Sequence, residues 1–498
     1  MAEPSPQEPR SQGARRVRPQ RLPARRLVGA CLAALVVPLA GCAIGAAKPQ
    51  TAATGNSGVK PAAAAVEAEP FASTYKPLPS QPTLIRNATI MTAVGPRLTG
   101  ASILLRDGKV AAVGADVVAP ADAVVVDGSG KWVTPGLIDT HSHLGVYAAP
   151  GGNGLDDGNE ATAPNTAEVW AEHSVWPQDP QFPLALAGGV TTMEILPGSA
   201  NLFGGRSVTL KNVPSVTVQG MKFPGAPYGL KMACGENPKR VYGTKGRAPS
   251  TRMGNVAGYR EAWIRARAYA DKWAKWKKEG SDADKRPERD LQLETLAGVL
   301  DGKIRVQNHC YRADEMAQMI DIAKEFGYKI ASFHHGVEAY KIRDVLAREG
   351  ICGSLWSNWW GFKIEAYDGI PQNIALMDEA GACAIVHSDS AQGIQRLNQD
   401  AAKSMRAGRE AGIDVSYEAA LRWITINPAK AIGVDQWTGS LEVGKMADVV
   451  LWSGDPFSIY SQPLQVWVDG ALLFDRKDKA RQPTTDFELG LPAKEVAW

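Results

Sequence analysis

The chain has 498 residues, of which 44% are hydrophobic and 21% are charged, a composition typical of a soluble globular enzyme. The formal net charge of +3 is misleading, because the first 41 residues carry seven arginines against only Glu3 and Glu8. The rest of the chain is nearly neutral. It therefore predicts no basic surface and no nucleic-acid partner.

The N-terminal segment is typical of an export signal. An arginine-rich stretch precedes an apolar run at 27–39, which is too short to cross a bilayer but fits the core of a signal peptide. The run ends in Leu-Ala-Gly-Cys42, which is similar to the bacterial lipobox, where the cysteine becomes the lipidated first residue. We therefore expect residues 1–42 to be a lipoprotein signal peptide and 43–81, rich in Ala, Pro, Ser and Thr, to be a flexible tether.

This arrangement predicts where the protein resides. A lipid on Cys42 would anchor it to the periplasmic side of a membrane of the bacterial cell envelope. Because Ala43 rather than Asp follows the cysteine, the outer membrane is favoured. Membrane contact through the lipid anchor is therefore an expected interaction of the mature chain.

Both ends of the remaining chain predict antiparallel β-structure. Within 82–136, short alternating apolar runs are separated by turn signals such as Asp107-Gly108. The same pattern returns within 437–480. We therefore expect one small β-sandwich built from 82–136 and 437–480, followed by a C-terminal tail at 481–498.

The middle of the chain, 137–436, alternates strand-like and helical segments. Between Ala313 and Gly327, for example, apolar residues recur at helical spacings of three and four. Eight strand-like runs are present, the number that a closed (β/α)8 barrel needs, so a TIM-like barrel of the α/β class is the expected fold. The runs are Gly136–His143, Val190–Leu196, Val208–Val218, Tyr228–Cys234, Lys303–His309, Lys329–His335, Ile351–Ser357 and Ala382–Asp389.

Four cysteines fall within or beside these predicted strands, namely Cys234, Cys310, Cys352 and Cys383. None of them has Cys-x-x-Cys spacing. They are predicted to be buried small apolar residues rather than disulfide partners.

Histidines gather where the predicted strands end. The chain has seven, and all except His173 lie at or next to the C-terminal end of a strand-like run. His141 and His143 are separated by one residue, so in a strand both imidazoles project from the same face. Because a (β/α) barrel builds its active site from these strand ends, the pattern predicts a metal site. The candidates are His141, His143, Lys231 or Glu236, His309, His334 or His335, and His387 with Asp389.

The stretch Pro135-Gly-Leu-Ile-Asp-Thr-His-Ser-His143 resembles the first-strand motif of the metal-dependent amidohydrolase superfamily. The tail from Asn427 to Trp452 resembles the imidazolonepropionase-like branch of that superfamily. The resemblance implies a distorted (β/α)8 barrel with one or two divalent metal ions per chain, zinc being the first candidate. By position it implies the ligands His141, His143, His309, His335 and Asp389, together with Lys231 as a lysine carboxylated by carbon dioxide.

Two of these ligand positions have alternatives. On the fourth strand Glu236 competes with Lys231, because a carboxylate needs no modification to bridge metals, and we favour Lys231. On the sixth strand we favour His335 over His334, because the family's sixth strand commonly ends in His-Gly. Adjacent residues face opposite sides of a strand, so only one of the two is expected to be a ligand.

The resemblance implies hydrolysis of amide or cyclic amide C–N bonds, small peptides included, by a metal-activated hydroxide. Asp389 is the expected catalytic base, and the substrate is expected to be a small or peptide-like molecule. Two alternatives stay open: a one-metal hydrolase or deaminase, and a non-catalytic lipid-anchored binding protein. The charged stretch 259–278 suggests a lid or a contact between copies in a homo-oligomer. Expected substrate-binding residues are His387, Asn201, Arg240 and Arg252.

Overall fold

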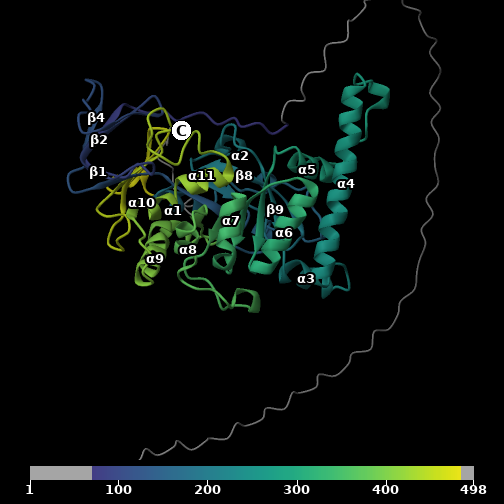
Figure 1. The fold of residues 1–498 in the computed structure, drawn as a ribbon. Helices are drawn as coiled ribbons and strands as arrows, with labels where there is room; N and C mark the ends of the chain where they lie inside the picture. The colour runs from purple at the N-terminus through teal and green to yellow at the C-terminus, as the bar shows by residue number, and fades with distance from the viewer. Residues whose placement is uncertain (1–69, 484–498) are drawn as a thin grey trace, which may run out of the picture. The chain divides into compact units, whose positions relative to one another are not determined.

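The computed structural model describes residues 70–483, which contain two sheets, one of them surrounded by helices (Figure 1). The predicted signal peptide, Cys42, most of the tether and most of the C-terminal tail lie outside the described residues. Among the helices of 70–483, none combines the length and the apolar character that crossing a membrane requires.

Eight strands form the barrel sheet, in the order β13-β12-β11-β10-β9-β8-β7-β6. The backbone at Trp423 and Ile424 lies in the gap between the first and last strands of this sheet. The Trp423 carbonyl accepts a hydrogen bond from the amide of Val386 (3.0 Å), and the Ile424 carbonyl accepts one from the amide of Ile138 (2.9 Å). The predicted α/β barrel is therefore confirmed. The strands are β6 (Leu137–Ser142), β7 (Val190–Ile195), β8 (Phe203–Lys211), β9 (Gly229–Ala233), β10 (Arg305–Cys310), β11 (Ile330–His335), β12 (Cys352–Leu355) and β13 (Ala384–Val386).

Strand β8 departs from the expected barrel. It begins at Phe203 rather than Val208, and it runs antiparallel to both β7 and β9. The reason is the short connection after β7, because parallel neighbours need a crossover of about a dozen residues or more, whereas antiparallel strands need only a hairpin. The segment Gly204-Gly-Arg206 lies in this strand.

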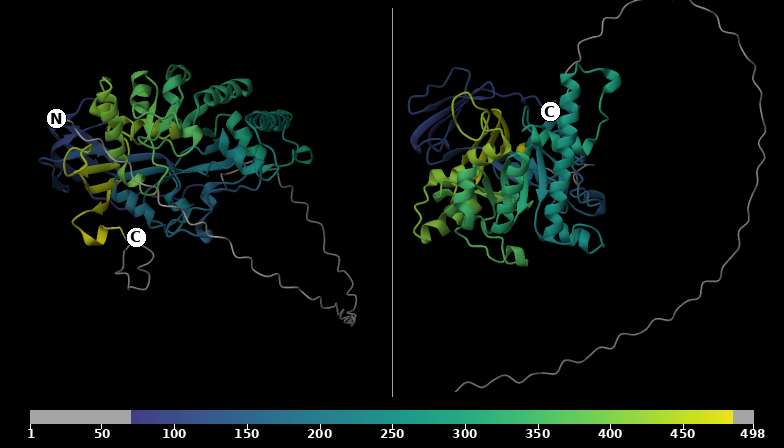
Figure 2. Two further views of the ribbon diagram at one scale, coloured as in Figure 1. Left: turned by 90° about the horizontal axis from the view of Figure 1, so that it is seen from below. Right: turned by 45° about the vertical axis from the view of Figure 1, so that its right-hand side comes forward.

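Helices cover the outside of the barrel (Figure 2). Helix α6 keeps the predicted apolar stripe buried and ends at Gly327, whose φ of 74° forms a left-handed cap. Helix α4 packs against the barrel through its N-terminal half, where Tyr259 and Trp263 are buried, while its C-terminal part extends beyond the barrel in Figure 1. The helices are α1 (Gln181–Ala187), α2 (Val218–Met221), α3 (Glu236–Gly243), α4 (Arg252–Lys278), α5 (Leu291–Leu300), α6 (Ala313–Phe326), α7 (Arg343–Glu349), α8 (Asn373–Glu379), α9 (Leu397–Glu410), α10 (Tyr417–Arg422) and α11 (Ile426–Ile432).

The second sheet is assembled from both ends of the described chain, as predicted. Its strands form one continuous sheet in the order β16-β15-β14-β5-β1-β2-β3, and β4 also pairs with β1. Buried residues such as Ile103, Val449 and Trp467 give it an apolar cluster of its own. The strands are β1 (Thr83–Ile90), β2 (Leu98–Arg106), β3 (Lys109–Gly114), β4 (Val124–Asp127), β5 (Trp132–Pro135), β14 (Val449–Trp452), β15 (Pro463–Val468) and β16 (Ala471–Asp475).

A buried ion cluster joins this sheet to the barrel. Lys211 at the end of β8 places its Nζ 2.7 Å from Asp469 Oδ2 and 3.2 Å from Asp448 Oδ1, and all three side chains are almost fully buried. The Tyr75 hydroxyl donates to Asp469, and the Thr438 hydroxyl donates to Asp448 at 2.7 Å. Tyr75 belongs to the end of the segment expected to be a tether, so that part of the segment contacts the folded body.

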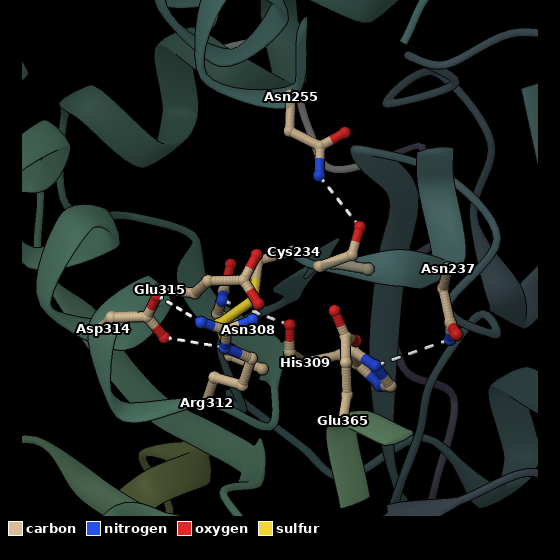
Figure 3. The surroundings of a disulfide bond; sticks show 12 residues. Cys234, Asn237, Asn255, Asn308, His309, Arg312, Asp314, Glu315 and Glu365 are labelled. Carbon is tan, nitrogen blue, oxygen red and sulfur yellow. Dashed lines mark hydrogen bonds and ion pairs between the residues drawn. A yellow bond between two sulfur atoms is a disulfide. The ribbon is translucent and has the colours of Figure 1, made fainter. Parts of the chain in front are cut away.

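The four cysteines of the described chain form two disulfides, so the prediction of unpaired cysteines was wrong. Cys234 follows β9 and bonds to Cys310 at the end of β10, as Figure 3 shows. Cys352 at the start of β12 bonds to Cys383, just before β13. Neighbouring parallel strands bring these residues to Cα distances of 5.2 and 4.4 Å despite sequence separations of 76 and 31 residues, and such distances suit a disulfide.

Candidate active site

The predicted strand ends converge at one end of the barrel. Potential ligand atoms of His141, His143 and Asp389 all lie within 4.8 Å of one another, and those of His141, His335 and His387 form a second such group. These side chains come from β6, from β11 and from the segment after β13. Positions that are far apart in sequence therefore form one cluster with the residue types of a metal site.

The hydrogen bonds of His143 define where its proton lies. Its Nδ1 is 2.8 Å from the carbonyl oxygen of Leu196, and because a carbonyl can only accept, Nδ1 carries the hydrogen. Its other ring nitrogen, Nε2, lies 3.2 Å from Asp389 Oδ1, while His141 Nε2 lies 3.6 Å from the same oxygen. Potential ligand atoms thus face one another across the cluster, an arrangement that a bound cation stabilises.

The remaining imidazoles also fit a cation. Nδ1 of His309, Nδ1 of His335 and both nitrogens of His387 are buried without a hydrogen-bond partner among the described residues. Burial lowers the pKa of each of these three histidines, so all are neutral. Neutral imidazole is the protonation state that binds a metal, so the donor set suits a divalent ion.

Lys231 is a fully buried lysine inside the barrel. From β9 its Nζ lies 3.3 Å from His141 Nε2 and donates to the carbonyl of Pro197 at 3.0 Å. No carboxylate of the described chain lies within ion-pair distance of this amine. Burial lowers the pKa of Lys231 to about 8, so the neutral amine is far more accessible than in an ordinary lysine.

Left-handed backbone turns two of these side chains into the cluster. His335 has φ of 70° and Asp389 has φ of 50°, values uncommon for residues other than glycine. At His335 this conformation breaks the alternation of the strand, so the rings of both His334 and His335 approach His141, at centroid distances of 4.8 and 4.6 Å. The prediction that only one of the two histidines is a ligand relied on regular alternation, and in the structure both rings lie beside His141 while only His335 belongs to a group of potential ligands.

Asp139 holds the two halves of this cluster together. Its Oδ1 accepts hydrogen bonds from the amides of His141 (3.1 Å) and Ser388 (3.2 Å), and its Oδ2 accepts one from the Ser388 hydroxyl. The amide of Asp389 in turn donates to the carbonyl of His141 at 3.0 Å. β6 and the segment that carries Asp389 are therefore fixed relative to each other.

Other predicted residues have different partners. Glu236 begins α3, and its Oε1 lies 3.4 Å from Lys363 Nζ; within residues 70–483 it forms no hydrogen bond or ion pair with the histidine cluster. Arg252 pairs with Glu315 at 3.0 Å and with Glu365, so its guanidinium is already engaged in the structure.

Asn201 is buried, and its amide donates to the carbonyls of Glu160 (2.8 Å) and Ala163 (2.7 Å). Its amide nitrogen therefore fixes a loop. Arg240 lies exposed on α3, close enough for its charge to act on Tyr311 and Lys363. Of the two arginines expected to bind substrate, Arg240 is thus the one without a carboxylate partner in the described chain.

The protein is similar to known proteins over most of its length. A solved amidohydrolase from Thermotoga maritima MSB8 is 38% identical, superposes with a TM-score of 0.73, and matches over 79% of this chain and 100% of that one. The chain belongs to the amidohydrolase family. Residues 363–474 also match the model of the amidohydrolase family. The resemblance of the first-strand motif to the amidohydrolase superfamily is therefore confirmed.

Two further relatives are matched by sequence. Amidohydrolase tasK of Hapsidospora irregularis is 34% identical over 434 residues, which are 79% of this chain but 43% of that protein. An imidazolonepropionase of Shewanella sp. (strain ANA-3) is 26% identical over 381 residues, which are 71% of this chain and 87% of that one. This amidohydrolase therefore spans less than half the length of the first of these relatives.

Three aromatic residues that the sequence analysis of this amidohydrolase did not predict also lie at the site. The Tyr147 ring lies 5.4 Å from that of His143, Tyr311 lies 4.6 Å from His309, and Trp356 lies 4.2 Å from His335. Two of these residues could have been predicted from the sequence, because Tyr311 follows His309 by two residues and Trp356 lies near the end of a predicted strand. Lys363 comes from a long loop, and no sequence pattern indicated that its Nζ would lie 4.2 Å from the centre of the Tyr311 ring.

Proposed function

We propose that this protein is a metal-dependent hydrolase of amide or cyclic amide C–N bonds, small peptides included, with one or two divalent ions per chain. The observation that carries the proposal is the convergence of potential ligand atoms of His141, His143 and Asp389, which all lie within 4.8 Å of one another. Zinc is the first candidate, because imidazole nitrogens and carboxylate oxygens are its usual ligands.

The described residues provide donors for two adjoining positions. His141, His143 and Asp389 would hold one ion, and His309 and His335, with His387 beside them, would hold the other. Lys231 would supply a further ligand after its neutral amine adds carbon dioxide and releases one proton, which leaves a carbamate whose oxygens carry the negative charge. Its location next to His141, without a carboxylate partner, supports this assignment over Glu236.

A bound divalent cation would lower the pKa of a water molecule and polarise the scissile carbonyl. Asp389 would accept the proton of the attacking water on a carboxylate oxygen and deliver it to the leaving nitrogen. The aromatic rings of Tyr147, Tyr311 and Trp356 would exclude bulk water from the reacting groups. Arg240, at the exposed edge, remains a proposed contact for a substrate carboxylate.

Metal content tests the proposal directly. Purified protein is expected to contain about one to two zinc-like ions per chain, and chelation is expected to abolish hydrolysis of dipeptides, N-acyl amino acids or cyclic imides. His141→Ala should lose bound metal. His173→Ala is the matched control, because His173 is the one histidine of the chain away from the cluster, with its side chain 46% exposed.

The outcomes separate the proposal from its rivals. Full turnover by metal-free protein would refute it. A single ion per chain, together with ammonia release from amino-substituted rings in place of amide cleavage, would favour a deaminase.

We further propose that the protein acts in the bacterial cell envelope, anchored by a lipid on Cys42. The two disulfides of the described chain support a location outside the reducing cytosol, where such bonds persist. Wild-type protein is expected to sediment with membranes, and Cys42→Ser is expected to become soluble or remain unprocessed. A Cys42→Ser protein that is processed and still sediments completely with membranes would contradict the anchor.

A further inference from the structure

A chain of hydrogen bonds leads from the cluster into the barrel interior. His141 Nδ1 lies 2.8 Å from His334 Nδ1, and His334 Nε2 lies 2.9 Å from Gln307 Oε1. Gln307 Nε2 in turn lies 3.3 Å from the carbonyl oxygen of Ala431. His141, His334 and Gln307 are each fully buried, so water does not compete for these contacts.

The last of these hydrogen bonds, from Gln307 to Ala431, determines where the proton of each earlier hydrogen bond lies. The Ala431 carbonyl can only accept, so the amide of Gln307 must present its NH2 group to Ala431 and its oxygen to His334. His334 must then carry its hydrogen on Nε2, which leaves a lone pair on Nδ1. His141 therefore donates from Nδ1, and its own lone pair is on Nε2, the atom that faces Asp389.

We propose that Gln307 and His334 are positioning residues that lock His141 into the tautomer and orientation in which Nε2 binds metal. This inference rests on the proposed metal-dependent function. His334, which the sequence offered as an alternative ligand, would then hold the ligand His141 in place without binding metal itself. Gln307 would likewise act on metal binding only through His334. In other metal sites, loss of such a partner weakens metal binding about 10- to 100-fold.

The experiment measures the affinity of metal-stripped protein for Zn²⁺ and Co²⁺ by competition with a chromophoric chelator. Gln307→Met, similar in size but without the accepting oxygen, should weaken binding about 10- to 100-fold. Ser354→Ala is the matched control. It removes a buried hydroxyl on strand β12 that hydrogen-bonds to Thr140 and takes no part in the hydrogen bonds that link His141, His334 and Gln307.

A second pair of variants separates positioning from general loss of packing. His334→Phe should weaken metal binding as Gln307→Met does, and the double variant should be no weaker than His334→Phe alone, because both changes break the same chain. Fully additive losses would contradict the proposal, as would equal affinities of Gln307→Met and wild type. Failure of wild-type protein to bind either metal would instead refute the proposed function itself.

Discussion

Lys231→Ala is expected to lose one of two bound metal ions and to reduce hydrolysis by about a thousandfold. A bound metal supplies several kcal/mol of transition-state stabilisation, and each 1.36 kcal/mol corresponds to a factor of ten in rate. Lys231 reaches this role only as a carboxylated side chain, because an ammonium has no lone pair to give a metal. Burial lowers the pKa of this amine to about 8, so the neutral form that reacts with carbon dioxide is more accessible than in an ordinary lysine. Elemental analysis and initial rates measure both effects.

The control for this experiment is Glu236→Gln, since Glu236 is the alternative ligand of the same strand. It should keep its metal and change substrate affinity at most, because its carboxylate contacts Lys363 in the structure. Added acetate or bicarbonate should partly restore metal to Lys231→Ala by occupying the vacated space. Two ions retained in Lys231→Ala, or metal lost in Glu236→Gln, would contradict the assignment.

Lys211→Met is expected to lower the free energy of unfolding by about 3–5 kcal/mol, the usual cost of removing one partner from a buried ion pair. The substitution leaves the carboxylates of Asp448 and Asp469 without their common cation, although both are almost fully buried. Burial already raises the pKa of Asp469, so its charge is unfavourable even beside Lys211. Urea unfolding followed by circular dichroism and by tryptophan fluorescence measures the loss.

Two further variants serve as controls for this prediction. Lys324→Met, which breaks a largely exposed pair with Glu349 at 2.8 Å, should cost less than about 1 kcal/mol. Adding Asp448→Asn and Asp469→Asn to Lys211→Met should recover part of the loss, because the unpaired charges are gone. A Lys211→Met protein as stable as wild type would show that the cluster does not stabilise the junction between sheet and barrel.

The fold could be predicted from sequence wherever the pattern was local. Alternating runs at both ends predicted the shared sheet, and the apolar spacing of Ala313–Phe326 predicted α6. The direction of β8 could not be predicted in this way, because hydrophobic alternation is the same in parallel and antiparallel strands. The length of the connection after β7 carried that information. The disulfides were missed for a similar reason, because pairing depends on which strands are neighbours and not on cysteine spacing.

The cluster at the strand ends could be predicted because a barrel brings these ends together. His141, His143, His335 and Asp389 lie close to one another, and Lys231 lies beside His141. The partners of buried polar groups could not be predicted, because they depend on side-chain directions that sequence does not contain. Arg252 and Asn201 therefore have structural partners, while Gln307, an unremarkable glutamine in the sequence, lies behind the cluster.

The left-handed backbone at His335 and Asp389 has a consequence for how this protein can evolve. A non-glycine residue in that region costs on the order of 1 kcal/mol or more, and the fold carries this cost twice within one cluster. Selection for heat resistance alone would therefore favour glycine or asparagine at both positions. Selection for turnover keeps the histidine and the aspartate. The lost stability must then be offset elsewhere in the fold, for example by the disulfides and the buried cluster at Lys211.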